Sequence, residues 1–91
     1  MKRDPDYFAD GHAELVYIAK RLDDALRLES IFTAAGVDYG VEADNYRGGV
    51  VFQSERVGAF FYVRPEGVAA AHQVMRENGY RPCEPDPRKS A

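Results

Sequence analysis

The order of elements along this 91-residue chain predicts an α+β fold built from two copies of a strand–helix–strand unit. Each copy has an apolar strand, a helix with one apolar stripe, and a glycine where the helix should end, at Gly36 and Gly79. Glycine suits this point because it adopts the left-handed conformation without a Cβ penalty. Right-handed crossovers make the two strands of each unit parallel, with a strand of the other unit between them. The sequence therefore predicts a ferredoxin-like βαββαβ two-layer sandwich, with an antiparallel four-strand sheet and both helices on one face.

The second unit carries the clearer pattern. Its strand, at 58–63, has aromatic or β-branched residues on both faces, which is typical of a central strand. Pro65 fits the first helical position, where the first turn leaves an N–H unpaired in any case. Apolar residues then recur at three- and four-residue steps, so we expect a helix near 65–78. Its buried stripe should consist of Val68, Ala71, Val74 and Met75.

The first unit repeats this arrangement. A strand is expected at 14–19 and a helix at 22–35, where Asp23 and Asp24 suit the positive helix end. In the strand we expect two apolar faces, formed by Leu15, Tyr17 and Ala19 on one side and by Val16 and Ile18 on the other. In the helix we expect a buried stripe of Leu22, Ala25, Leu28, Phe32 and Ala35.

The remaining strands are shorter or more polar. Residues 37–43 alternate between apolar and polar, which indicates an edge or half-solvated strand. Residues 44–49 have the composition of a turn. The apolar stretch 50–52 could lengthen the hairpin or enter the core as an irregular segment. The last strand is expected at 80–83, and the prolines that follow keep it short.

These elements divide the chain into three parts. Residues 1–12 are expected to be a flexible arm, although Tyr7 and Phe8 could dock on the domain. Residues 13–83 form the single ferredoxin-like domain, and residues 84–91 a disordered, proline-rich tail.

Composition limits the partners and the compartment. A net charge of −3 and a pI near 5.3 argue against nucleic acid or an acidic membrane as the main partner. The single cysteine, Cys83, excludes an internal disulfide and fits a reducing compartment. The apolar run near the start is too short for a signal peptide or a membrane span, so we expect a cytoplasmic protein.

Several short motifs resemble those of a bacterial family. They are Val16-Tyr17-Ile18-Ala19, Asp24-Ala25, Ala34-Ala35-Gly36-Val37, the stretch from Glu42 to Asn45, and Val63-Arg64-Pro65-Glu66 before Ala71. Together they resemble the small bacterial proteins grouped as prokaryotic signal-transducing proteins, a domain of unknown function. The resemblance covers about 14–80, and it implies a fold similar to the nitrogen-regulatory PII proteins and a non-catalytic regulatory role. PII proteins make their ligand and partner contacts through the loop between strands two and three, which corresponds here to 44–56. This loop is much shorter than in PII proteins and has no phosphate-binding motif, so neither nucleotide nor any other cofactor is expected.

The expected contact site therefore lies in this loop. Aromatic side chains beside arginines can bind a planar or anionic ligand, or a protein partner. The residues concerned are Asp44, Asn45, Tyr46, Arg47, Gly48, Gly49 and Arg56, with Tyr39 and Tyr62 close by. The alternative is that the tyrosines pack in the core and at a subunit contact, while the arginines are solvated.

A second hypothesis is a small enzyme of isomerase or oxygenase type, which would use a cavity on the open sheet face. Its candidate residues are Tyr17, Tyr62 and His12, and only fold analogy supports it. His72 is expected to be a packing or surface residue, and Cys83 a free thiol. No metal-ligand spacing is present.

The open sheet face also predicts association. Either Phe60 and Tyr62 or the alternate set Val57, Ala59, Phe61 and Val63 would be exposed there, and such patches usually mark an interface. We expect a homodimer through Phe60, Tyr62 and Tyr17. The alternative is that Tyr7 and Phe8, or residues 50–52, cover the face within one chain.

Overall fold

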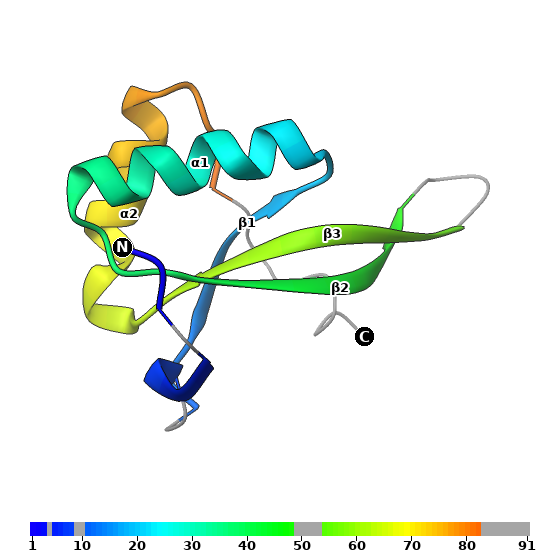
Figure 1. The fold of residues 1–91 in the computed structure, drawn as a ribbon, viewed down its shortest axis with the longest axis horizontal. Helices are drawn as coiled ribbons and strands as arrows, with labels where there is room; N and C mark the ends of the chain where they lie inside the picture. The colour runs from blue at the N-terminus through cyan, green and yellow to red at the C-terminus, as the bar shows by residue number, and fades with distance from the viewer. Residues whose placement is uncertain (4, 9–10, 49–53, 83–91) are drawn as a thin grey trace.

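The fold comes from a computed structural model, which describes residues 1–3, 5–8, 11–48 and 54–82 (Figure 1). Two helices pack beside an antiparallel sheet, so the α+β class is confirmed. The elements are the 3-10 helix η1 (Pro5–Phe8), β1 (Glu14–Ala19), α1 (Leu22–Ala35), β2 (Gly40–Gly48), β3 (Ser54–Val63), the 3-10 turn η2 (Pro65–Gly67) and α2 (Val68–Glu77).

The sheet of described residues has three strands in the order β1-β3-β2, and both neighbouring pairs are antiparallel. This is the order that the ferredoxin-like plan requires of its first three strands. The predicted fourth strand is not seen, because residues 80–82 belong to no strand and Cys83 lies outside the described residues. Pro82 lacks the N–H that a ladder would need, which is consistent with irregular backbone there.

Both helices bury their apolar stripes in one core against the same sheet face. From the helices this core takes Ala25, Leu28, Phe32, Ala71 and Met75, and from the strands Val16, Ala19, Phe61 and Val63. Two members of the stripe predicted for α1 are wrong, since Ala35 is exposed and Leu22 is 75% exposed. They lie at the two ends of the helix, and Ile31 packs against the core between them.

The two helices end in the same way, as predicted. Gly36 and Gly79 have φ angles of 75° and 81°, in the left-handed region. The residue after each glycine donates its N–H back into the last turn, from Val37 to the Phe32 carbonyl at 2.9 Å and from Tyr80 to the Met75 carbonyl at 2.8 Å. Both ends are therefore Schellman motifs.

The faces predicted for β1 are wrong because the strand contains a β-bulge. Leu15 pairs with Tyr62 of β3, but Tyr17 pairs with the next residue, Phe61, so Val16 is inserted. Val16 and Tyr17 consequently both pack on the helix side. Tyr17 was expected at a dimer interface on the open face, and it lies on the covered face instead.

The hairpin is longer than predicted. The strand expected at 37–43 is β2, which runs from Gly40 to Gly48, and the turn expected at 44–49 is strand as far as Gly48. Asp44 and Asn45 pair with Gly58 and Val57, because cross-strand pairing outweighs the local preference of Asp and Asn for turns. Residues 49–53 lie outside the described residues. In Figure 1 the hairpin extends well beyond α1.

The face of β3 that points away from the helices carries Phe60 and Tyr62, one of the two sets that alternation predicted. Phe60 is completely buried within the single chain, so it offers no surface to a second copy. Tyr62 is half-buried. Of the three residues expected at a dimer interface, only Tyr62 combines a place on the open face with partial exposure; dimerisation itself stays a prediction.

The described part of the N-terminal arm packs against the domain, which is the docking alternative considered for Tyr7 and Phe8. Lys2 forms a parallel bridge with Tyr39, just before β2. The Arg3 N–H donates to the Tyr39 carbonyl at 2.7 Å, and the Tyr39 N–H donates to the Met1 carbonyl at 3.1 Å. The Met1 amino group also bonds to the Val37 carbonyl.

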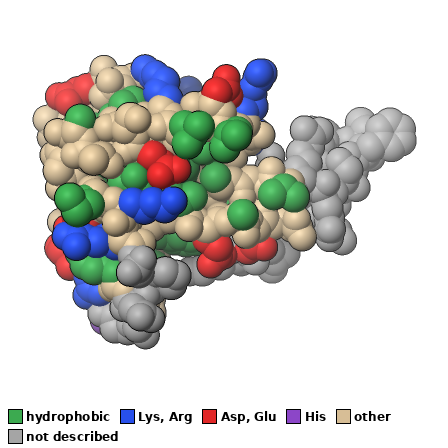
Figure 2. Space-filling view, viewed as in Figure 1, with side chains coloured by type: hydrophobic (Ala, Val, Ile, Leu, Met, Phe, Trp, Pro, Cys, Tyr) green, Lys and Arg blue, Asp and Glu red, His purple; other side chains and the backbone are tan. Residues whose placement is uncertain are grey.

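Several large apolar side chains remain on the surface. Leu26 of α1 and Val57 of β3 are 54% and 68% exposed, and Leu22 is more exposed still. Figure 2 shows hydrophobic side chains on the surface over both α1 and the hairpin. None of the described helices combines the length and the apolar character that crossing a bilayer requires.

Candidate functional site

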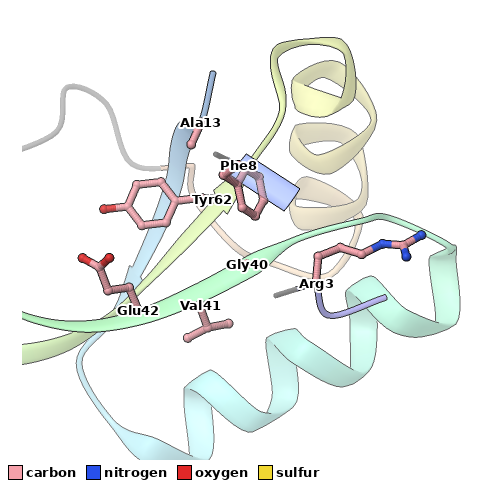
Figure 3. Close-up of a pocket in the computed structure, with 7 residues that line it drawn as sticks. All are labelled: Arg3, Phe8, Ala13, Gly40, Val41, Glu42 and Tyr62. Atoms are coloured by element: carbon pink, nitrogen blue, oxygen red, sulfur yellow. The ribbon is translucent and has the colours of Figure 1, made fainter. Parts of the chain in front are cut away.

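A cavity of about 320 Å³ lies between the N-terminal arm and the open face of the sheet (Figure 3). The arm, the segment before β1, the start of β2 and the end of β3 all contribute to it. Its lining residues are Arg3, Phe8, Ala13, Gly40, Val41, Glu42 and Tyr62. The cavity is thus at the base of the hairpin, at the opposite end from the predicted loop site.

A glycine positions the aromatic wall of the cavity. Gly40 pairs with Tyr62 across the sheet and is buried. A Cβ atom at Gly40 would lie only 2.5 Å from Cε2 of Phe8, so the Phe8 ring lies directly against the glycine backbone. Glycine inside a strand often marks such a close approach.

Ionic and aromatic contacts hold the arm in this position. Arg3 Nε donates to Asp38 Oδ1 at 3.0 Å, and this hydrogen bond raises the pKa of the Arg3 guanidinium above its ordinary value. The Arg3 and Arg64 guanidinium groups lie 5.3 Å and 5.7 Å from the Tyr7 ring centre, within cation–π range. Arg64 Nη1 also donates to the Tyr7 carbonyl at 3.2 Å. The arm is therefore anchored at Arg3 and at Tyr7, the residue just before Phe8.

Among the described residues, the walls combine two aromatic rings with one carboxylate. In Figure 3, the Phe8 and Tyr62 rings lie on the same side of β2, and the Glu42 carboxylate extends toward the Tyr62 side of the cavity. The guanidinium of Arg3 points away from Tyr62, toward its partner Asp38. Charge near the rings is therefore contributed by Glu42, which favours a neutral or cationic ligand group over an anionic one.

The residues predicted to form the loop site lie farther along the hairpin. Asp44, Asn45, Tyr46, Arg47 and Gly48 are on β2, Arg56 is on β3, and Gly49 lies outside the described residues. The structure brings two of them together, because Tyr46 pairs with Arg56 across the hairpin. Tyr62 is the one residue of the wider aromatic group that lines the cavity.

The other candidate residues that the structure describes do not line the cavity. The Tyr39 hydroxyl is 3.4 Å from both Glu29 Oε1 and Thr33 Oγ1, and burial raises the pKa of Tyr39 above its ordinary value. The Tyr17 hydroxyl donates to Asp24 Oδ2 at 2.8 Å, on the helix side of the sheet. His12 is exposed, and Cys83 is outside the described residues. Of the three residues considered for catalysis, Tyr62 alone lines the cavity.

Most of the cavity was not predicted. Phe8 was expected in a flexible arm, with docking on the domain as the alternative, and Gly40 and Glu42 were expected only on the polar face of an edge strand. The available signal was Gly40 itself, because a glycine within an alternating strand indicates a close neighbour. That neighbour could not be identified from sequence, since Phe8 is 32 residues away in the chain.

Comparison with protein families, with curated proteins and with solved structures finds no match to this chain. Within the described residues, no group of three His, Cys, Asp or Glu side chains is arranged to hold a metal ion.

Proposed function

We propose that this protein is a regulatory, non-catalytic binding module that holds a small ligand between its N-terminal arm and the open face of its sheet. The observation that carries the proposal is the seating of Phe8 on Gly40, which places two aromatic rings around a cavity. A volume near 320 Å³ is at the lower end for small-molecule sites, so the ligand is expected to be small.

The wall chemistry suggests the class of ligand. The Tyr62 and Phe8 rings favour a flat ring or a compact apolar group. A carboxylate has about four acceptor positions, so Glu42 can accept a hydrogen bond from a ligand in addition to its contacts within the chain. An aromatic or heterocyclic molecule with an ammonium or N–H donor fits these walls better than the anionic ligand expected from the sequence.

A regulatory role follows from the way the site is built. One wall belongs to a short arm, and the other walls belong to the sheet. A ligand that binds only when the arm is docked stabilises the docked state by mass action. Ligand occupancy would therefore change the exposure of the arm, which a partner protein could detect. This role matches the one that the family resemblance implied, and the complete ferredoxin-like plan with a fourth strand remains part of the proposal.

A direct test is amide NMR with three small probes. Phenethylamine offers a ring and a cation, phenylacetate a ring and an anion, and cyclohexylamine a cation without an aromatic ring. We expect millimolar phenethylamine to shift the amide signals of Gly40, Glu42 and Tyr62, with much smaller shifts from the other two probes. Unchanged signals with all three probes would refute a site for this class of ligand.

Substitutions of the wall residues test which side chains bind phenethylamine. Tyr62→Leu should weaken phenethylamine binding about tenfold, which corresponds to the loss of about 1.4 kcal/mol of ring contact. Glu42→Gln should weaken phenethylamine binding but not the binding of a neutral aromatic alcohol of the same shape. Glu77→Gln, which changes an exposed acid on α2, is the matched control. Equal effects of Glu42→Gln and Glu77→Gln would show that the carboxylate in the cavity does not select the ligand.

A further inference from the structure

The outer edge of β2 already binds one extended segment, the first residues of the chain. Tyr39 both donates its N–H to Met1 and accepts the N–H of Arg3, so both of its backbone groups point away from β3. Backbone groups of a strand alternate between its two edges with a period of two. Val41 and Ala43 therefore also direct their N–H and C=O groups to the outer edge. Within the described residues, β2 itself pairs only with β3, so these groups continue the edge that the arm begins to fill.

The flank of α1 carries exposed leucines, together with the polar residues Glu29, Ser30 and Thr33 that line a groove beside Tyr39. Glu29 and Thr33 lie close to the Tyr39 hydroxyl, and a shallow groove beside Tyr39 continues along the helix to Leu26. Leu22 lies one turn before Leu26 on the same helix face and is also exposed. Figure 1 shows α1 running antiparallel to β2, so the first turns of α1 lie toward the end of the hairpin that follows Tyr39.

The hairpin adds a third exposed apolar residue. Val57 alternates with Ala59 and Phe61 along β3, which face the helices, so Val57 is on the helix side of the hairpin. Figure 2 shows hydrophobic side chains at the surface over both α1 and the hairpin. An open strand edge therefore lies beside exposed apolar side chains, which is the arrangement that binds an added β-strand.

We propose that this edge and flank, defined by Val41, Ala43, Leu22, Leu26 and Val57, bind an extended segment of another protein as an added strand. The partner residues that face α1 would be apolar. The alternate residues would face the side of β2 that carries Glu42 and Asp44, so they are expected to be basic. The partner is thus an extended segment in which apolar and basic residues alternate, and it continues the pairing that the arm begins at Tyr39.

A second copy of β2 fits this edge less well. Pairing Ala43 with Val41 or with Ala43 of another molecule about a two-fold axis would place Glu42 opposite Glu42 or Asp44, and pairing Val41 with Val41 would place Asp44 opposite Asp38. Like charges directly opposite each other destabilise a strand pair. Charge complementarity therefore favours a different protein as the source of the segment.

The test is selection of octapeptides from a random phage-displayed library on the immobilised full-length chain. We expect selected peptides to alternate apolar and basic residues. A synthetic selected peptide should bind the wild-type protein, and binding should fall at least tenfold in Ala43→Pro, which removes one N–H from the outer edge but none from the β2–β3 ladder. Ala43→Val, which keeps that N–H, is the matched control and should bind within about twofold of wild type.

A second measurement does not depend on the folding of a variant. The same peptide, N-methylated at alternate residues on the side that faces β2, should lose binding to the wild-type protein, while methylation on the other side should not. Binding that withstands both Ala43→Pro and N-methylation would overturn the added strand, as would the absence of any selected binder. If the free chain dimerises and Ala43→Pro abolishes the dimer, the segment that binds this edge is a second copy of the chain. That result would overturn the proposed class of partner.

Discussion

The ring of Phe8 lies against the backbone of Gly40, at a place where a Cβ atom would be only 2.5 Å from the ring. One contact thus joins the N-terminal arm to the edge strand and forms a wall of the cavity. Two further contacts hold the arm before Phe8, from Arg3 to Asp38 and from Arg64 to the Tyr7 carbonyl. The candidate site therefore requires that residue 40 has no side chain.

Gly40→Ala should displace Phe8 and remove the cavity while leaving the fold intact. The added methyl cannot coexist with the ring, so we expect the arm to lose protection in hydrogen exchange and the domain to lose about 1 kcal/mol of stability. Gly67→Ala is the control. A Cβ atom at Gly67 would lie 4.0 Å from Cβ of Val63, an ordinary contact distance, when the residues adjacent in sequence are left aside. If Gly40→Ala keeps the arm as protected as Gly67→Ala does, the contact does not hold the arm.

Replacement of the glycines that end the helices should cost stability through backbone strain. Gly36→Val and Gly79→Val are each expected to lower the free energy of unfolding by about 1 kcal/mol or more, since both positions have positive φ. No atom would clash with a Cβ at either site, so strain alone is tested. Asn tolerates the left-handed region better, and Gly36→Asn should therefore lose less than Gly36→Val in urea unfolding. Equal losses would argue against backbone strain as the cause.

The hydrogen bond from Tyr17 to Asp24 should appear as a coupling energy. Tyr17→Phe is expected to cost about 1 kcal/mol, because it removes a partly buried hydroxyl that donates at 2.8 Å. A double-mutant cycle with Asp24→Ala should give a coupling of similar size. The same cycle with the exposed neighbour Asp23 should give a coupling near zero. Coupling to both residues alike would mean a general helix-end effect instead of this bond.

The free energy of unfolding should fall at alkaline pH because two buried tyrosines ionise. Burial raises the pKa of Tyr39 and of Tyr80, so the folded state retains protons that the unfolded chain releases. The contribution of these groups is complete below the ordinary tyrosine pKa of about 10 and is lost as pH rises above it. Urea unfolding on both sides of that pH should show this loss, and the double variant Tyr39→Phe/Tyr80→Phe should show less of it. If the double variant loses as much stability at alkaline pH as the wild-type protein, groups other than these two tyrosines cause the loss.

Local signals allowed correct prediction of both helices. The glycines at 36 and 79 fix the helix ends through backbone geometry, which depends on few neighbours. The start was less exact, because Pro65 begins the 3-10 turn η2 and α2 itself begins at Val68. The two sets of residues on opposite faces of β3 were also predicted correctly, because the bulge in the β1–β3 pair lies in β1 and β3 itself alternates regularly. Leu22 and Ala35 were wrongly placed in the core, since periodicity does not reveal where the sheet beneath a helix ends.

Features that depend on distant pairing were not predictable. The bulge in β1 follows from its register against β3, and the extension of β2 to Gly48 follows from pairing with residues 54–58. The cavity needs Phe8 and Gly40 in contact, and no local pattern relates them. Glycine indicated that something approaches β2, but only the fold identifies it.

The bulge in β1 also determines whether the two repeated units are autonomous. It turns Tyr17 toward the helices, where its hydroxyl meets Asp24 of the first unit and its ring meets Phe61 and Tyr80 of the second, with centres 6.5 Å and 5.1 Å away. Counted from Leu15, which pairs with Tyr62 of the open face, regular alternation would place this side chain on that face. A single inserted residue thus interlocks the halves of an apparent duplication, so neither half should fold when expressed separately and the intact domain should unfold in one cooperative transition.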